Sequence, residues 1–181
     1  FLSMREAATL YHFATTVPHG GTIVEIGSWK GKSTYCLARG LKKGKVFAID
    51  PFDASGEGGS AEIYQQGQGN QPLLKGFKNH MRKLRVLGKI NILKGYSKDF
   101  VNQIDQINLL FIDGDHSQEG AEFDFRSYSP AIANGGYLLF HDYDASRKEL
   151  GPTWVIENFV VPSNEYEFIG LFDSLWVGRK L

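Results

Sequence analysis

The segment "IVEIGSWKGKST", residues 23–34, is an apolar run that ends in a glycine-containing turn. Its last part, Gly31-Lys32-Ser33, is similar to the end of a phosphate-binding P-loop. A P-loop requires one residue more, because only three residues separate Gly27 from Gly31. A dinucleotide-binding turn needs a second glycine where this chain has Trp29, whose ring would crowd a pyrophosphate. The turn is therefore typical of neither a triphosphate nor a dinucleotide site.

The composition is that of a globular protein. The chain has 181 residues, of which 42% are hydrophobic and 22% are charged, enough for one domain with a substantial core. Lys plus Arg and Asp plus Glu both number 20, so no overall field attracts nucleic acid or a membrane surface. We expect a single domain over residues 1–181, with an N-terminal helical segment at 1–19 and no nucleic-acid or membrane partner.

The location of the protein is predicted from what the sequence lacks. Its single cysteine, Cys36, lies in an apolar helical pattern and is interpreted as core filler in a reducing compartment. The sequence has neither a transmembrane-length apolar run nor a signal-peptide pattern. We therefore expect a cytoplasmic protein.

Predicted strands and helices alternate along the chain. Ser3 and Glu6 have capping-box spacing at the start of the first helix, and the Asn134-Gly135-Gly136 segment predicts a turn. A glycine-rich stretch at 53–70 is interpreted as a mobile loop. We expect strands at 21–27, 45–50, 89–95, 107–115 and 135–143, helices at 3–16, 33–44, 73–84, 121–130 and 154–159, and a hairpin at 166–180 around Asp173.

Most predicted strands are continuous apolar runs, which is typical of a parallel sheet covered by helices on both faces. Ligands of such sheets bind beyond the carboxyl ends of the strands. The carboxyl end of each of these strands carries polar residues or glycine: Glu25 to Gly27, Asp50, Gly95 to Ser97, Asp113 to His116, and His141 to Tyr143. Asp50 lies 19 residues after Gly31, a spacing at which an acid reaches ribose hydroxyls in mononucleotide-binding halves.

Four motifs carry a family resemblance: "VEIGSWKGKST", "FAIDPFD", "FIDGDHSQEGAEFDF" and "GGYLLFHDY". In this order and spacing they resemble the class I S-adenosylmethionine-dependent methyltransferases, in the branch of the macrocin and catechol O-methyltransferase-like enzymes. The resemblance spans roughly residues 20–180. It implies an α/β, Rossmann-like three-layer sandwich with a mostly parallel seven-stranded sheet and an antiparallel last strand.

The resemblance also implies a cofactor site for S-adenosylmethionine. Glu25 would support the first turn, Asp50 would bind the ribose, and Asp113 would lie beneath the reactive methyl group. The residues implied on the methionine side are Gly27, Ser28, Gly31 and Ser33, and those implied on the adenine side are Pro51, Phe52 and Ser97. On this interpretation Lys32 is an exposed residue of the first helical turn.

Catechol-type relatives hold Mg²⁺ or another divalent cation, which lowers the pKa of the acceptor hydroxyl. By position the implied ligands are Asp113, His141 and Asp142, and His116 replaces the lysine base of those relatives. Since Mg²⁺ prefers oxygen ligands, His141 points away, a softer metal binds, or no metal binds. His141 is alternatively a capping or core histidine, and His116 alternatively caps the next helix, with Asp115 shaping the turn.

The resemblance favours methylation of a small-molecule hydroxyl, on a sugar or a catechol-like diol. The acceptor site would come from the N-terminal helix, the 53–70 loop, the 143–155 segment or a second subunit in a homodimer. Two alternatives stay open: a nicotinamide-dependent oxidoreductase of similar topology, and a non-catalytic module with the methyltransferase fold. His12, His19 and His80 are scattered and are interpreted as surface residues.

Overall fold

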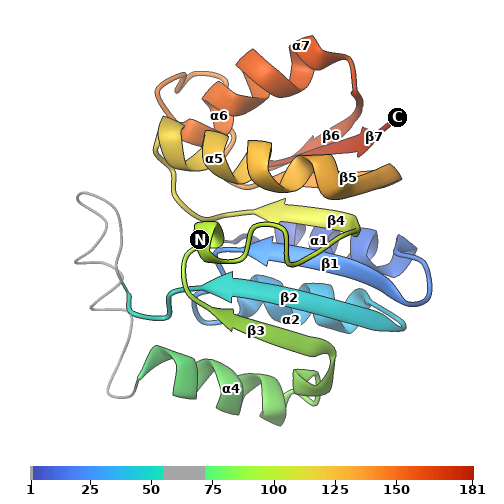
Figure 1. The fold of residues 1–181 in the computed structure, drawn as a ribbon, viewed down its shortest axis with the longest axis vertical. Helices are drawn as coiled ribbons and strands as arrows, with labels where there is room; N and C mark the ends of the chain where they lie inside the picture. The colour runs from blue at the N-terminus through green and yellow to red at the C-terminus, as the bar shows by residue number, and fades with distance from the viewer. Residues whose placement is uncertain (1, 55–71) are drawn as a thin grey trace.

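The computed structural model of the protein describes residues 2–54 and 72–181 (Figure 1). Its strands are β1 (Gly21–Ile26), β2 (Gly44–Asp50), β3 (Ile90–Lys94), β4 (Ile107–Ile112), β5 (Ile132–Phe140), β6 (Tyr166–Phe172) and β7 (Leu175–Lys180). They form a seven-stranded sheet in the order β3-β2-β1-β4-β5-β7-β6. The pairs among β1 to β5 are parallel, and β7 runs antiparallel to both β5 and β6. The predicted fold class, with its antiparallel last strand, is confirmed.

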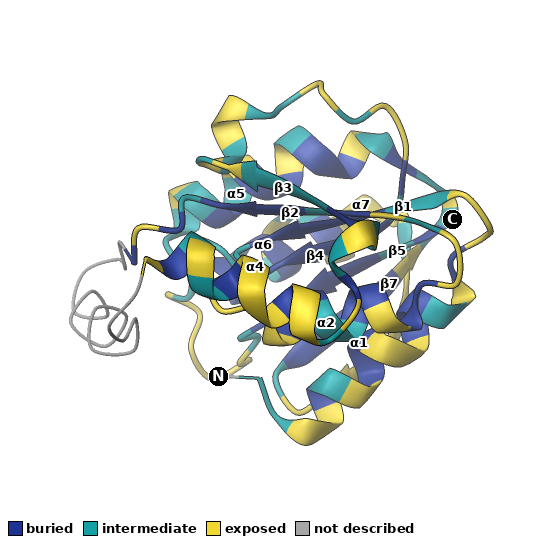
Figure 2. Ribbon diagram, turned by 90° about the horizontal axis from the view of Figure 1, so that it is seen from below, coloured by how far each residue is buried: buried dark blue, intermediate teal, exposed yellow. Residues whose placement is uncertain are grey.

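Helices cover both faces of the sheet, and Figure 2 shows buried strands between helices whose outer surfaces are exposed. On one face lie α1 (Met4–Thr16), α2 (Lys32–Gly40) and α4 (Leu73–Lys83), and on the other α5 (Gln118–Tyr128) and α6 (Gly151–Val155). Successive strand residues point to opposite faces. Ile23 therefore belongs to the core beneath α1 and α2, whereas Val24 belongs to the core beneath α5 and α6.

The carboxyl ends of the parallel strands share one edge. In Figure 1 the arrowheads of β1, β2, β3 and β4 all point to the left, and the loops that follow them meet there. The sheet order reverses between β1 and β4, because the chain moves outward through β2 and β3 and then returns to pair β4 with β1. This reversal is the switch point at which α/β sheets bind ligands.

Several element boundaries differ from the prediction, among them the ends of β4 at Ile112 and of β5 at Phe140. Helix α2 ends at Gly40 rather than at Gly44, which instead begins β2. A Cβ on Gly40 would lie 2.4 Å from the backbone oxygen of Tyr11, so the end of α2 packs directly on α1. Strand β5 begins at Ile132, before the predicted turn, because Ile132 already pairs with Ile107 of β4. The register shifts between this pair and the pair of Tyr137 with Leu109, and Gly135 has a φ of 76° in that irregular part.

The helical segment after β5 is longer than the predicted 154–159. It begins at Gly151 with α6, continues through a π-helical turn at Ile156–Val160, and ends with α7 (Val161–Ser163). Pro152 lies in the first turn, where its missing N–H costs no hydrogen bond. Residues 55–70 of the predicted mobile loop lie outside the described residues. None of the described helices is both long enough and apolar enough to cross a bilayer.

We predict that Gly40→Ala lowers the free energy of unfolding by about 1–3 kcal/mol, because the added methyl group overpacks the contact between α1 and α2. Urea unfolding measures the change. The control is Gly88→Ala, since a Cβ on that exposed glycine meets no atom within 4 Å. Equal stability of the two variants would contradict the tight packing of α1 on α2.

Candidate active site

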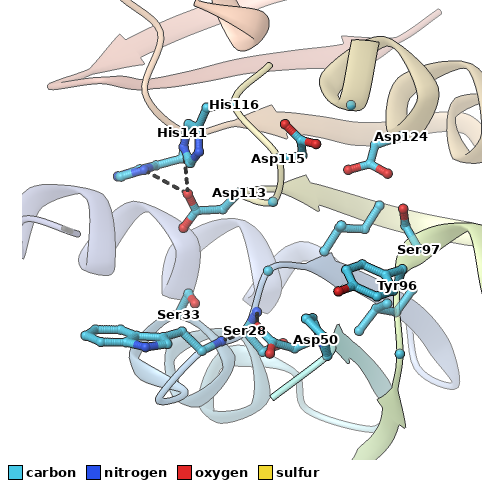
Figure 3. A pocket seen from close by; sticks show the side chains of 18 of the residues that line it. Ser28, Ser33, Asp50, Tyr96, Ser97, Asp113, Asp115, His116, Asp124 and His141 are labelled. Atoms are coloured by element: carbon cyan, nitrogen blue, oxygen red, sulfur yellow. Dashed lines mark hydrogen bonds and ion pairs between the residues drawn. The ribbon is translucent and has the colours of Figure 1, made fainter. Parts of the chain in front are cut away.

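A cavity of about 610 Å³ opens at the carboxyl edge of the sheet. Segments that follow five strands line it, from the turn after β1 to the segment after β5. Figure 3 shows Ser28, Ser33 and Asp50 on one side of the cavity, Asp113, His116 and His141 on another, and Ser97 with Asp124 at a third. The polar residues predicted at the carboxyl ends of the strands therefore lie around one cavity.

The Asp50 carboxylate fixes the floor of this cavity. Its Oδ2 accepts the backbone N–H groups of Ser28 and Trp29 at 2.9 and 2.7 Å, and its Oδ1 accepts that of Phe52 at 2.6 Å. Burial raises the pKa of Asp50 although these amides oppose the shift. A carboxylate has about four acceptor positions, so about one is left for a ribose hydroxyl.

Gly27 is required where β1 passes the end of β4. Its φ is 88°, and a Cβ there would lie 2.0 Å from the backbone oxygen of Asp113. The resemblance implies that Gly27 lies on the methionine side of the cofactor, and Gly27 lines the cavity. It also allows the end of β4 to approach closely, which brings Asp113 against the turn. Lys32 is exposed, as predicted, and donates to the Leu2 carbonyl.

Glu25 lies fully buried beneath the turn and is not among the residues that line the cavity. Its Oε2 accepts hydrogen bonds from the hydroxyl groups of Ser28, at 2.8 Å, and Thr34. Burial raises the pKa of Glu25 to about 7 against these hydrogen bonds. This placement is consistent with the supporting role implied for Glu25.

Two other predicted cofactor residues contact the core rather than the cavity. Gly31 has a φ of 86°, and a Cβ there would lie 2.8 Å from atoms of Phe77 and Met81. The Phe52 ring packs edge-on against Phe77, with 5.0 Å between ring centroids. The remaining predicted residues, Gly27, Ser28, Ser33, Asp50, Pro51, Ser97 and Asp113, line the cavity.

Asp124 lines the cavity beside Ser97 and was not predicted. It is 3% exposed, and burial raises its pKa to about 7 although a hydrogen bond with the Ser97 side chain opposes the shift. Tyr128 donates to the Ser97 carbonyl at 2.6 Å, so α5 holds the loop after β3 from two positions. The sequence signal was available, because Asp124 lies on the face of α5 that carries Ala121 and Tyr128.

Two carboxylates and two imidazoles meet at the ends of β4 and β5, and we call Asp113, His116, His141 and Asp142 the carboxylate–histidine cluster. His116 Nε2 lies 2.9 Å from Asp142 Oδ2 and 3.8 Å from Asp113 Oδ1. His141 Nδ1 lies 3.1 Å from Asp113 Oδ1 and 3.0 Å from Asp142 Oδ2. The alternative in which His141 points away from the cluster is thus excluded.

The charges of the cluster depend on one another. Burial disfavours a charged imidazole at His141, but Asp113 and Asp142 outweigh it and raise its pKa to about 11. Burial also opposes the charge on Asp142, yet His116 and His141 hold the pKa of that carboxyl well below its ordinary value. A proton or a metal cation is therefore strongly favoured between these groups.

Asp113, His141 and Asp142 each offer a ligand atom, and these atoms all lie within 4.8 Å of one another. His141 is 3% exposed, and its Nδ1 makes no well-directed hydrogen bond within the described part of the chain. A buried nitrogen aimed at two carboxylates fits a divalent cation. The donor set of nitrogen and oxygen suits transition metals better than Mg²⁺.

The remaining histidines and Cys36 lie outside the cavity. His12, His19 and His80 are exposed, as predicted. Cys36 is half-buried against the core, and burial raises the pKa of its thiol.

The chain matches a family model described as a methyltransferase domain over residues 24–143. The chain belongs to this methyltransferase family. The resemblance to class I S-adenosylmethionine-dependent methyltransferases is thereby confirmed. An uncharacterized protein of Acanthamoeba polyphaga mimivirus is 28% identical to this chain over 133 residues. That match covers 70% of this chain and 53% of the viral protein, so the chain spans about half the length of that curated relative.

Solved structures share the fold of this chain. The O-methyltransferase NovP superposes with a TM-score of 0.71 at 18% identity, over 98% of this chain and 80% of NovP. The O-methyltransferase TomG from Streptomyces achromogenes, solved with S-adenosylmethionine, gives 0.71 at 13% identity, over 100% and 81%. A TDP-rhamnose 3′-O-methyltransferase of calicheamicin biosynthesis gives 0.60 at 16% identity, over 96% and 76%.

We predict that Glu25→Gln flattens the pH dependence of the protein's stability. The folded pKa of Glu25 is raised from 4.5 to about 7. The stability from its protonated form is therefore complete below pH 4.5 and is lost as the pH rises through about 7, a change of about 3 kcal/mol. Urea unfolding from about pH 5 to about pH 8 measures the slope, which the substitution reduces because an amide does not ionise.

The control for this prediction is Glu119→Gln, at an exposed carboxylate in the first turn of α5. It keeps the wild-type slope. A Glu25→Gln variant with the wild-type slope would show that Glu25 is ionised in the folded protein across this pH range.

Proposed function

We propose that this protein is an S-adenosylmethionine-dependent methyltransferase that acts on a hydroxyl group of a small molecule. The observation that carries the proposal is the shared cavity, in which the turn after β1 faces the carboxylate–histidine cluster. One side offers backbone and hydroxyl groups at the switch point of the sheet. The other offers groups that accept a proton and hold a cation.

Residues along three sides of the cavity would hold the cofactor, which supplies a methyl group on a positively charged sulfur. Ser28 and Ser33 lie at the turn for its amino-acid end, and Asp50 has about one acceptor position left for a ribose hydroxyl. Ser97 and Asp124 lie together at the opposite end, where polar side chains would select the adenine. Asp113 lies between these ends. Methyl transfer is an in-line displacement, so the main task of these groups is orientation.

His116 would accept the proton of the acceptor hydroxyl. Its Nε2 contacts Asp142 Oδ2 at 2.9 Å, and such a carboxylate orients an imidazole and stabilises the imidazolium that forms. Asp113 and His116 are both partly accessible from the cavity, as an acceptor site requires.

Asp113, His141 and Asp142 would hold a divalent cation, which lowers the pKa of a hydroxyl close to it. The chain's own contribution is the fixed placement of these three ligands at the ends of β4 and β5. His116 stands beside them, 2.9 Å from Asp142. A hydroxyl that enters this corner would therefore meet the base and the cation site together.

The acceptor class follows from the fold and the cavity. The O-methyltransferase neighbours, one of which acts on TDP-rhamnose, support a sugar or a catechol-like diol as the acceptor. Trp29 and Phe123 line the cavity and offer aromatic surfaces to such a ring. The nicotinamide alternative is disfavoured, because Trp29 stands in the turn that a pyrophosphate would approach. A second subunit that completes the acceptor site remains part of this proposal.

We predict acceptor-dependent methyl transfer in a screen of sugar and catechol hydroxyls with added Mg²⁺ or Mn²⁺. His116→Ala lowers kcat about a hundredfold or more, because a general base is lost, whereas binding of S-adenosylhomocysteine stays unchanged. The assay follows formation of S-adenosylhomocysteine, and His80→Ala at an exposed, distant histidine is the control. Full activity of His116→Ala would contradict its role as the base. Absence of turnover with every acceptor would favour the non-catalytic alternative.

A further inference from the structure

Glu6 joins the N-terminal helix to the carboxylate–histidine cluster. It is 2% exposed, and each of its carboxylate oxygens has two partners. Oε1 accepts the backbone N–H and the hydroxyl of Ser174, at 2.9 and 2.7 Å. Oε2 accepts the Ser3 backbone N–H at 2.6 Å and lies 3.3 Å from His141 Nε2. The capping box accounts for only one of these four contacts.

The contact with Glu6 determines which nitrogen of the His141 ring carries a proton. An ionised carboxylate only accepts hydrogen bonds, so Nε2 must be the donor toward Glu6. Nδ1 then faces Asp113 Oδ1 and Asp142 Oδ2, at 3.1 and 3.0 Å. A divalent cation that replaces the proton on Nδ1 leaves Nε2–H bonded to Glu6, and the Nδ1 lone pair and those two carboxylate oxygens then meet at one point.

We propose that Glu6 is a positioning residue that holds His141 in the Nε2-protonated tautomer, so that His141 Nδ1, Asp113 and Asp142 together bind a divalent transition-metal cation. This inference rests on the proposed function and deepens it, because it names the class of metal and the group that orients its nitrogen ligand. A carboxylate behind a ligating histidine fixes the ring and strengthens its donor nitrogen.

The three ligand atoms determine which class of divalent cation the site prefers. One imidazole nitrogen and two carboxylates suit Mn²⁺, Fe²⁺, Co²⁺ or Zn²⁺, whereas Mg²⁺ favours oxygen ligands and retained water. His141 is almost fully buried and Glu6 fixes its ring. A water molecule therefore cannot replace the imidazole as a metal ligand unless the ring moves and leaves a cavity. Mg²⁺ is therefore expected to bind this site more weakly than the transition metals.

The arrangement makes α1 a part of the metal site. Ser3 donates to Asp173 Oδ2 at 2.6 Å, so the start of α1 is tied to the turn between β6 and β7 as well as to His141. Metal bound at Nδ1 would strengthen the Nε2 contact with Glu6 and thus the docking of α1.

The test is metal binding to Glu6→Gln, measured by calorimetry with Mn²⁺ and with Zn²⁺. If the amide NH₂ of the introduced side chain faces Nε2, that nitrogen becomes an acceptor and the ring proton moves to Nδ1. If the amide oxygen faces Nε2, a neutral acceptor replaces the charged one and the Nε2–H hydrogen bond weakens. We expect the affinity for both metals to fall about 10- to 100-fold. In ¹⁵N-histidine NMR spectra, Zn²⁺-loaded wild type shows His141 protonated at Nε2 and metal-bound at Nδ1, and Glu6→Gln loses this signature.

Ser174→Ala is the matched control, because it removes a partner of Glu6 and leaves the contact with His141. It keeps wild-type metal affinity and the same NMR signature. Wild-type affinity in Glu6→Gln, or His141 signals that Zn²⁺ leaves unchanged, would overturn the inference. Calorimetry with S-adenosylhomocysteine on the same samples separates the two proposals. Binding of S-adenosylhomocysteine without metal binding overturns the metal site and leaves the methyltransferase assignment in place, whereas metal binding without S-adenosylhomocysteine binding overturns that assignment.

Discussion

The site depends on the Asp50 carboxylate and its three backbone amide donors. Asp50 ends β2, and the amides of Ser28 and Trp29 belong to the turn after β1, so one buried side chain holds two neighbouring strand ends in register. Its third donor, Phe52, directs the chain away from β2 and into the core. Removal of this carboxylate would leave buried N–H groups without partners, which is a larger loss than the hydrogen bonds alone.

The other buried acids are placed around this fixed turn, and each has a separate partner set. Glu25 lies below it with two hydroxyl donors, Asp124 lies at the Ser97 end, and Glu6 lies behind His141. Their environments push their pKa values in different directions: burial raises those of Glu25 and Asp124 to about 7, whereas donors from Ser3 and Ser174 overcome burial and lower that of Glu6. Around neutral pH the buried carboxyl groups of this region therefore include both protonated and ionised ones.

The sequence predicted the sheet and the strand ends because their signals are local. Apolar runs followed by polar residues identified β1 to β5, and the known rule for α/β sheets placed Asp50, Asp113 and His141 at one edge. The contacts made by Glu6 could not be predicted, since its capping-box role already explains the residue and His141 is 135 positions away. That the chain itself also requires Gly27 could not be predicted, because only the structure places the Asp113 backbone oxygen 2.0 Å from the position of its Cβ. The end of α2 depends in the same way on its packing against α1.

The central claim is that this cavity binds an S-adenosyl cofactor, and calorimetric titration with S-adenosylhomocysteine tests it most directly. We expect one binding site per chain for S-adenosylhomocysteine and no heat of binding for NAD⁺ under the same conditions. Binding of NAD⁺ without binding of S-adenosylhomocysteine would contradict this claim.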